Sequence, residues 1–164
     1  MFTHSRALRM SPKVNNNTFA MKNSLLKISN VTSYRVIYGD TDQMGVVYYA
    51  NYLLWFERGR SEWLRQIGLP YATIEQHGFH FPVSEVSCRY AQSAHYDDVV
   101  RIETVLTELG RASLSFDYQI SREADCCILA TGSTKHACID RSGRVARIPR
   151  ILTDAINAAA PSRP

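Results

Sequence analysis

One long amphipathic helix is the feature that most limits the folds open to this chain. Between Tyr49 and Gln66, apolar residues recur at three- and four-residue steps, the spacing of one helix face. These positions are Tyr52, Trp55, Phe56, Gly59, Trp63 and Ile67. Charged residues fill the opposite face, and Gly68 followed by Pro70 is a typical helix end. Because a helix with one apolar face has to bury it, the rest of the chain should supply a partner surface.

That partner surface is predicted to be a β-sheet. Residues 31–38 are rich in β-branched and aromatic side chains and indicate a first strand. Further strands are expected at 80–91, 97–108, 112–122 and 127–139, with short helices near 71–77 and 151–159. Neighbouring strands joined by short turns should pair antiparallel. The sequence therefore predicts an α+β domain in which one long helix covers an antiparallel sheet.

The segment just before the helix holds the residues best suited to chemistry. Asp40 and Asp42 precede Gly45, and the helix begins a few residues later. The free N–H groups of a first helical turn can polarise a carbonyl, and a nearby carboxylate can act as nucleophile or general base. The alternative for Asp42 is a capping or turn carboxylate. Gly45 is expected to permit a close backbone approach or a positive φ angle.

The same segment resembles a known family. Its Asp-x-Asp-x-x-Gly-x-Val-x-Tyr pattern, followed by Asn-Tyr, is similar to that of the hotdog-fold acyl-CoA thioesterases, in particular the 4-hydroxybenzoyl-CoA thioesterase family with its YbgC-like enzymes. The matching residues are Asp40, Asp42, Gly45, Val47, Tyr49, Asn51 and Tyr52. A second block, residues 93–99, falls about where the family has a Tyr-x-Asp-x-Val segment. The resemblance covers about residues 31 to 155 and implies a hotdog fold, an antiparallel sheet wrapped around one long central helix.

The resemblance also implies an activity, the hydrolysis of an acyl-CoA thioester to a free acid and coenzyme A without a metal or bound cofactor. Asp42 matches the family's nucleophile or general base, and the two roles stay open. Tyr49 matches the position whose backbone N–H holds the thioester oxygen. Family members form homodimers or homotetramers with the site at the subunit interface. An aromatic or a short- to medium-chain acyl group is expected.

Candidate substrate-binding residues follow from the size and charge of an acyl-CoA. Coenzyme A carries phosphates, so Arg89 and Lys135 are expected to bind it. Tyr52 and Trp55 are expected to line an acyl pocket, with core packing as the alternative. Asn51 is expected to orient the motif loop or to serve a structural role.

Four alternatives compete with this interpretation. Glu57 and Glu62 are rival catalytic carboxylates, because another hotdog lineage places its carboxylate on the helix; pairing with neighbouring arginines is their alternative role. The substrate could be an acyl carrier protein thioester. The chain could also be a non-catalytic acyl-binding module, against which an intact Asp42 argues. A hotdog dehydratase is disfavoured because it needs a His, and none lies in the Asp42 loop.

The charge pattern divides the chain. The net charge is +4, but residues 1–39 hold six basic residues and no acid, so the remaining 13 basic and 15 acidic residues give residues 40–164 a net charge of −2. This pattern argues against a nucleic-acid-binding domain, which needs a basic face on its folded body. Residues 1–29 are therefore predicted to be a basic, disordered extension and residues 30–160 the hotdog domain. Import into an organelle by this extension is left open.

Composition limits the compartment and the metal chemistry. The sequence has no apolar run of 18 residues, so no membrane span is expected. Its four cysteines form no Cys-x-x-Cys pair, and no His lies at zinc-like spacing from them. Free thiols in a reducing compartment, the cytoplasm, are predicted.

Overall fold

The computed structural model describes residues 28–160. Its elements are β1 (Ser29–Arg35), the 3-10 turn η2 (Tyr38–Asp40), α1 (Asn51–Gln66), α2 (Tyr71–Gln76), β2 (Phe79–His80), β3 (Val83–Tyr90), β4 (Val99–Leu109), β5 (Ser113–Arg122), β6 (Ile128–Ala137), β7 (Ile139–Asp140) and α3 (Arg150–Ala159). Most of the predicted basic extension, residues 1–27, lies outside the described residues. None of the helices within 28–160 is long and apolar enough to cross a lipid bilayer.

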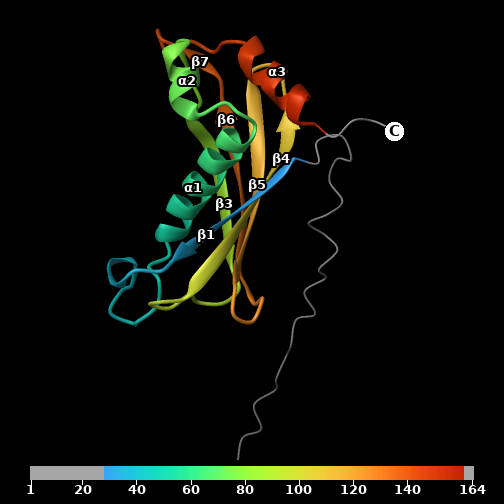
Figure 1. Cartoon of the computed structure of the whole chain (residues 1–164). Coiled ribbons are helices and arrows are strands. Elements are labelled where there is room, and N and C mark those ends of the chain that lie inside the picture. The colour runs from blue at the N-terminus through green and yellow to red at the C-terminus, as the bar shows by residue number, and fades with distance from the viewer. Residues whose placement is uncertain (1–27, 161–164) are drawn as a thin grey trace, which may run out of the picture.

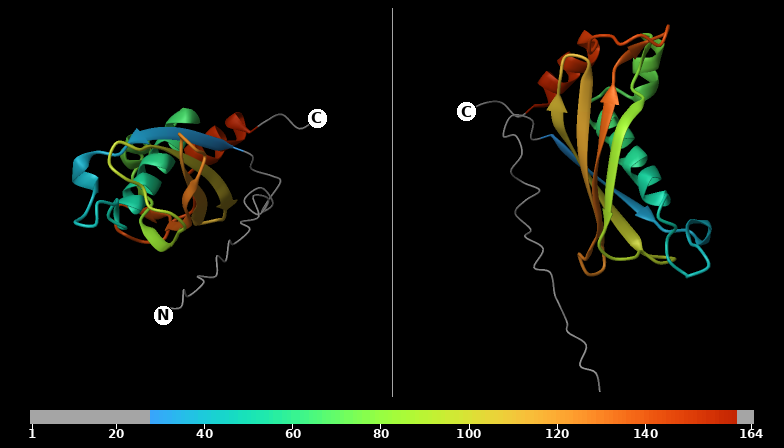
Figure 2. Two further views of the ribbon diagram at one scale, coloured as in Figure 1. Left: turned by 90° about the horizontal axis from the view of Figure 1, so that it is seen from below. Right: turned by 180° about the vertical axis from the view of Figure 1, so that it is seen from behind.

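Five strands form one antiparallel sheet in the order β1-β4-β5-β6-β3. The sheet is strongly twisted, and α1 lies diagonally against one face of it (Figure 1). Seen from behind, the long strands stand in front of the helix and curl towards it (Figure 2). The predicted α+β arrangement of one long helix on an antiparallel sheet is confirmed.

The order of strands in the sheet does not follow their order in the sequence, because β3 lies at an edge away from β4. β4, β5 and β6 pair in sequence order, but β3 pairs with β6 at the far edge, and β1 takes the place beside β4. Residues 91–98 must therefore pass from one edge of the sheet towards the other. Their course runs past the start of α1, and this crossing brings a second chain segment to that end of the helix.

The first strand is also shorter at its end than the sequence indicates. β1 ends at Arg35, not at residue 38, because the chain turns into η2. The Asp40 carboxylate accepts the Ile37 N–H at 3.0 Å and holds this turn. Such a local side-chain acceptor offers the backbone an alternative to the sheet ladder.

The predicted apolar face of α1 is the centre of the core. Tyr52, Trp55, Phe56 and Trp63 are all buried on the sheet. Gly132 on β6 lets the helix come close, because a Cβ there would collide with the Phe56 ring and with a β3 carbonyl. The Phe56 ring stacks on Tyr118 with centroids 4.3 Å apart.

The two ends of α1 differ. Near its end lie α2 and α3 (Figure 1), whose buried side chains are Ile74 of α2 and Leu152 and Ile156 of α3. At its start, the loop before α1 and the segment 91–98 meet without a covering helix.

Candidate active site

The Asp42 loop is a small hairpin with fixed geometry. Thr41 bridges to Val47, and the Asp42 N–H donates to the Val46 carbonyl at 2.9 Å. One carboxylate oxygen of Asp42 accepts the Met44 N–H at 2.8 Å, which is an Asx turn. Gly45 has a φ angle of 73°, so the predicted positive φ is confirmed. Among residues 28–160, no hydrogen bond reaches the other carboxylate oxygen of Asp42, Oδ2.

Asp40 and Asn51 hold this loop against the helix. The Asp40 carboxylate accepts the Tyr34 hydroxyl at 2.8 Å, besides the Ile37 N–H. Burial and this hydrogen bond raise the pKa of Tyr34, which therefore stays a donor. The Asn51 side-chain amide donates to the Asp40 carbonyl at 2.8 Å, tying the loop to the first residue of α1. Asp40 thus braces the loop.

A hollow of about 330 Å³ opens beside Asp42. It is bordered by the Asp42 loop, the start of α1, the end of β3 and the residues that follow β3: Asp42, Met44, Val46, Val47, Tyr49, Tyr52, Tyr90, Ala91, Gln92 and Ser93. Asp42 is the only carboxylate among these bordering residues, and they include no His, Cys, Lys or Arg.

The start of α1 faces the same hollow. The Asn51 N–H already donates to Tyr48, whereas no backbone carbonyl among residues 28–160 accepts the Tyr49 N–H. The residue before the helix, Ala50, has no side-chain acceptor to cap the first turn. An uncapped helix start favours an anionic or polarised oxygen of a ligand.

Tyrosines form the walls of the hollow. The Tyr90 hydroxyl donates to the Tyr49 carbonyl at 3.0 Å, and the Tyr90 and Tyr52 rings meet edge to face at 5.2 Å. Burial, followed by a hydrogen bond with Cys88, raises the pKa of Tyr90 to about 12. Burial also raises the pKa of Tyr52. These hydroxyls stay protonated at neutral pH, which leaves Asp42 as the basic group of the hollow.

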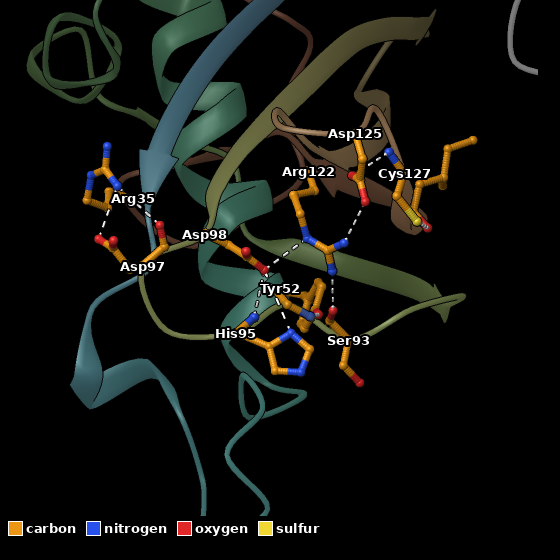
Figure 3. Close-up of polar contacts among 11 residues, drawn as sticks. Arg35, Tyr52, Ser93, His95, Asp97, Asp98, Arg122, Asp125 and Cys127 are labelled. Carbon is orange, nitrogen blue, oxygen red and sulfur yellow. Dashed lines mark hydrogen bonds and ion pairs between the residues drawn. The ribbon is translucent and has the colours of Figure 1, made fainter.

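Arg122, at the end of β5, fixes the crossing segment (Figure 3). Its guanidinium donates to the Asp98 carboxylate at 3.1 Å, to the Asp125 carboxylate at 2.9 Å and to the Ser93 carbonyl at 2.9 Å. The Asp98 carboxylate in turn accepts the His95 N–H at 2.8 Å. One planar cation thus holds both ends of residues 93–98.

The crossing segment, residues 91–98, connects the Arg122 network to the hollow. The buried Ala94 donates its N–H to the Tyr52 hydroxyl at 3.1 Å and accepts the Val47 N–H at 2.8 Å. Tyr52 belongs to α1 and Val47 to the Asp42 loop, so this one residue joins the two parts of the hollow. Arg122 was not singled out from the sequence.

A Ser-His-Asp arrangement is not assembled nearby. His95 Nδ1 lies 3.9 Å from Asp98 Oδ2, beyond hydrogen-bond distance. Ser93 contributes its carbonyl to the Arg122 network. Within residues 28–160, no group of three His, Cys, Asp or Glu residues could hold a metal ion.

The predicted site residues separate into two groups. Asp42, Gly45, Tyr49 and Tyr52 meet at the hollow, and Asn51 lies directly behind it. Tyr90 and residues 91–93 also line it; of these, only Ser93 belongs to the second sequence block, residues 93–99.

The structure does not bring Trp55 or Lys135 into this hollow. Trp55 is buried between Tyr34 and Tyr52. Lys135 lies about 16 Å along β6 from Ala130, the partner of Tyr90, and pairs with Glu85. Arg89 is exposed and directly precedes Tyr90.

The two helix carboxylates take their alternative role. Glu57 pairs with Arg60, and Glu62 pairs with Arg65 at 2.6 Å. Both pairs join residues three apart on α1, a common arrangement of opposite charges along a helix.

Comparison with known proteins agrees with this geometry. The family model of the Thioesterase-like superfamily matches residues 36–158. The acyl-CoA thioesterase YbgC of Haemophilus influenzae is 36% identical over 107 residues, 65% of this chain and 77% of that protein. The DHNA-CoA thioesterase of Staphylococcus aureus superposes with a TM-score of 0.74 at 30% identity, covering 79% of this chain and 87% of that one. The 1,4-dihydroxy-2-naphthoyl-CoA thioesterase of Synechocystis superposes with a TM-score of 0.73 at 26% identity, covering 80% of this chain and 97% of that one. The resemblance inferred from the motif and the hotdog fold is confirmed.

Proposed function

This chain belongs to the Thioesterase-like superfamily, and from that premise we propose that it hydrolyses acyl-CoA thioesters to a free acid and coenzyme A. The observation that carries the proposal is the position of Asp42, the only carboxylate among the described residues that line a hollow at the uncapped start of α1. Thioester hydrolysis needs these two elements: a base or nucleophile, and a donor for the oxygen that gains negative charge.

In the proposed reaction the thioester carbonyl oxygen accepts the Tyr49 N–H. Asp42 then acts in one of two ways. As a general base it takes a proton from the water that attacks the carbonyl carbon; the C–S bond breaks and the thiolate of coenzyme A leaves. As a nucleophile it forms a mixed anhydride with loss of the thiolate, and water then hydrolyses the anhydride.

The acyl group is proposed to be aromatic. Tyr49, Tyr52 and Tyr90 supply flat apolar surface on the walls of the hollow. The two solved thioesterases compared above are named for an aromatic acyl-CoA. Arg89, next to Tyr90, is the proposed contact for a coenzyme A phosphate.

The test is release of coenzyme A, followed with a thiol reagent, from benzoyl-, hydroxybenzoyl-, short-chain and long-chain acyl-CoA. Asp42→Asn is expected to lower kcat by about 10²–10⁴-fold, because it removes the carboxylate but keeps the acceptor for Met44. Asp97→Asn is the matched control: Asp97 is exposed, has a φ angle of 69°, and Asn tolerates that backbone.

Near-normal kcat in Asp42→Asn would overturn the role of Asp42. If the wild type turns over no CoA thioester but cleaves an acyl carrier protein thioester, the substrate class changes. If it binds acyl-CoA without cleaving either, the chain is a binding module.

We further propose a homodimer formed through β3. This strand ends the sheet, and its side chains are mostly exposed on both faces, including Val83, Val86 and Tyr90. An exposed edge with apolar side chains is a template for pairing with a second chain. Tyr90 belongs both to this edge and to the hollow, so a partner on β3 would also border the site.

Val86→Lys tests the dimer, because a charge near the middle of an edge strand opposes strand pairing. By size-exclusion chromatography with light scattering, we expect the mass of a dimer or tetramer for the wild type and of a monomer for the variant. The variant should also have a reduced kcat/KM. A dimeric Val86→Lys protein would contradict pairing through β3.

We also propose a cytoplasmic location, since all four cysteines are free.

A further inference from the structure

A second cavity, of about 240 Å³, lies along the other half of α1. It is walled by buried apolar side chains from the helices and the sheet: Trp63, Ile74, Leu106, Phe116, Leu152 and Ile156. None of the residues that line it borders the Asp42 hollow. Cavities with fully apolar walls and smaller volumes can bind small hydrocarbons, so the space is sufficient for a ligand.

Packing inside the subunit separates the two spaces. Phe56 lies one helical turn after Tyr52, which borders the hollow, and one turn before Arg60, which borders the cavity. Its ring is fully buried, stacks on Tyr118 and rests on Gly132. A ligand in the cavity is therefore held apart from Asp42 by this layer of the core.

Most polar groups of the cavity wall are engaged elsewhere. His136 Nδ1 contacts the Phe81 carbonyl at 3.0 Å, and its Nε2 contacts the Thr134 hydroxyl at 2.9 Å. A carbonyl can only accept, so Nδ1 carries the proton and Thr134 donates to Nε2. The Tyr71 hydroxyl accepts the Phe81 N–H at 3.0 Å. Beside the apolar walls, the lining of the cavity keeps Ser61 and the ion pair of Arg60 with Glu57, and Arg60 is the only cation among its described residues, because His136 is neutral.

Arg60 is more buried than Arg65, the other arginine of α1 that pairs with a glutamate. Arg60 pairs with Glu57 and Arg65 with Glu62, both at i, i+3, yet the Arg60 side chain is 18% exposed and that of Arg65 57%. The Arg60 guanidinium also lies close enough to the buried Tyr118 hydroxyl to lower its pKa, against the larger effect of burial. Arg60 therefore points inward, whereas its partner Glu57 is 58% exposed.

We propose that this cavity binds an amphipathic carboxylate, whose apolar body lies between Trp63, Ile74 and Leu152 and whose carboxylate pairs with Arg60 at the mouth. The guanidinium has five N–H donors and matches a carboxylate in a bidentate manner, while Glu57 can turn to solvent. Surroundings of low dielectric strengthen this pairing relative to that of an exposed arginine. This ligand class follows from the cavity alone; the acids that the proposed reaction releases belong to the same class.

The two tryptophans of the chain allow a direct test, since Trp63 lines the cavity and Trp55 does not. In a Trp55→Phe protein of full length, the emission of Trp63 reports on the cavity alone. Octanoate is expected to change it saturably. Octan-1-ol, which lacks the charge, is expected to bind at least about tenfold more weakly.

Three variants in the Trp55→Phe background sharpen the test. Arg60→Met should weaken octanoate binding by at least about tenfold, and Leu152→Phe should weaken it by filling the cavity. Arg65→Met, the matched control, should leave it unchanged. Equal octanoate affinity in Arg60→Met and Arg65→Met, or a Trp63 emission that octanoate does not change, would overturn the proposal.

The result is independent of the proposed hydrolysis. Octanoate binding requires no turnover, and an Asp42→Asn, Trp55→Phe protein should bind octanoate as the Trp55→Phe protein does. Loss of binding in this Asp42 variant would place octanoate in the Asp42 hollow and reject the second site. Retained binding in a protein without thioesterase activity would support the cavity and reject only the enzymatic proposal.

Discussion

The two ends of α1 face opposite surroundings. At its start, Tyr49 and Met44 are 60% and 79% exposed around Asp42, and hydrogen bonds hold the loop and the crossing segment in place. Towards its other end, Trp63 of α1 and Ile74 of α2 are fully buried. One helix thus joins a polar, open end at the Asp42 hollow to an apolar, closed end, whose buried side chains contribute to stability and surround the second cavity.

This difference teaches how the molecule divides its tasks. Groups at the open end have to reach a ligand, so few of them are buried, and directional hydrogen bonds fix their positions. Groups at the closed end contribute through burial, which is roughly proportional to apolar area. Variants at the closed end should therefore lower stability, and variants at the open end should lower activity.

The largest expected change in stability comes from Phe116→Ala at the closed end. Phe116 is buried, and its ring meets Trp63 edge to face at 5.2 Å. The truncation leaves a cavity and should lower the free energy of unfolding by about 3–5 kcal/mol, measured by urea denaturation. Met44→Ala at the open end should change it by less than about 0.5 kcal/mol. Equal losses in the two variants would remove the distinction between the ends.

Arg122→Met should lower both stability and activity, because Arg122 holds the open end. The variant leaves the Asp98 carboxylate and the Ser93 carbonyl without their shared donor, at a cost of about 1–3 kcal/mol. Since Ala94 joins Tyr52 to the Asp42 loop, kcat should also fall when it is measured well below the unfolding transition temperature, where the variant is folded. Arg101→Met, on an exposed position of β4, is the control. A kcat equal to that of the control would show that Arg122 supports the fold without positioning the site.

The extent to which the site was predictable follows from how the chain reaches it. Asp42, Gly45 and Tyr49 lie within eight residues of sequence, so their spacing alone indicated a carboxylate beside a helix start. Tyr90 and Arg122 reach the site through the order of strands in the sheet. Strand alternation does not specify that order, so their roles could not be read from local pattern.

The aromatic residues of α1 show the same limit. Helical spacing placed Tyr52, Trp55 and Phe56 on one face, which the structure confirms. Spacing does not tell which part of that face remains open. Tyr52 borders the hollow because the segment 91–98 passes beside it, and Trp55 is covered by Tyr34. The depth of burial is a property of the packed sheet.

A smaller effect is expected from pH at the closed end. Burial lowers the pKa of His136 in the folded state below its ordinary value of about 6.5. The unfolded chain therefore takes up the proton first. Stability from this group is present above about pH 6.5 and is lost as the pH falls from there towards the folded pKa, by at most about 1.4 kcal/mol per pH unit. His136→Gln should flatten this part of the urea-midpoint profile, and His95→Gln, at an exposed loop position, should not. A profile that His136→Gln leaves unaltered would assign the pH dependence to other groups.

The smallest change is expected where the chain enters the closed end. Deleting residues 1–27 should alter the free energy of unfolding by less than about 0.5 kcal/mol and leave kcat unchanged, because Ile28 and Ser29, which hydrogen-bond to α1, are kept. The Trp63 indole donates to the Ile28 carbonyl at 2.9 Å, and the Gln66 amide donates to the Ser29 carbonyl at 3.0 Å. Deleting residues 1–29 removes both acceptors and a buried isoleucine. Removal of these two further residues should therefore lower the free energy of unfolding measurably, while kcat at low temperature stays unchanged. Equal stability in the two truncated proteins would mean that the closed end does not depend on its first strand.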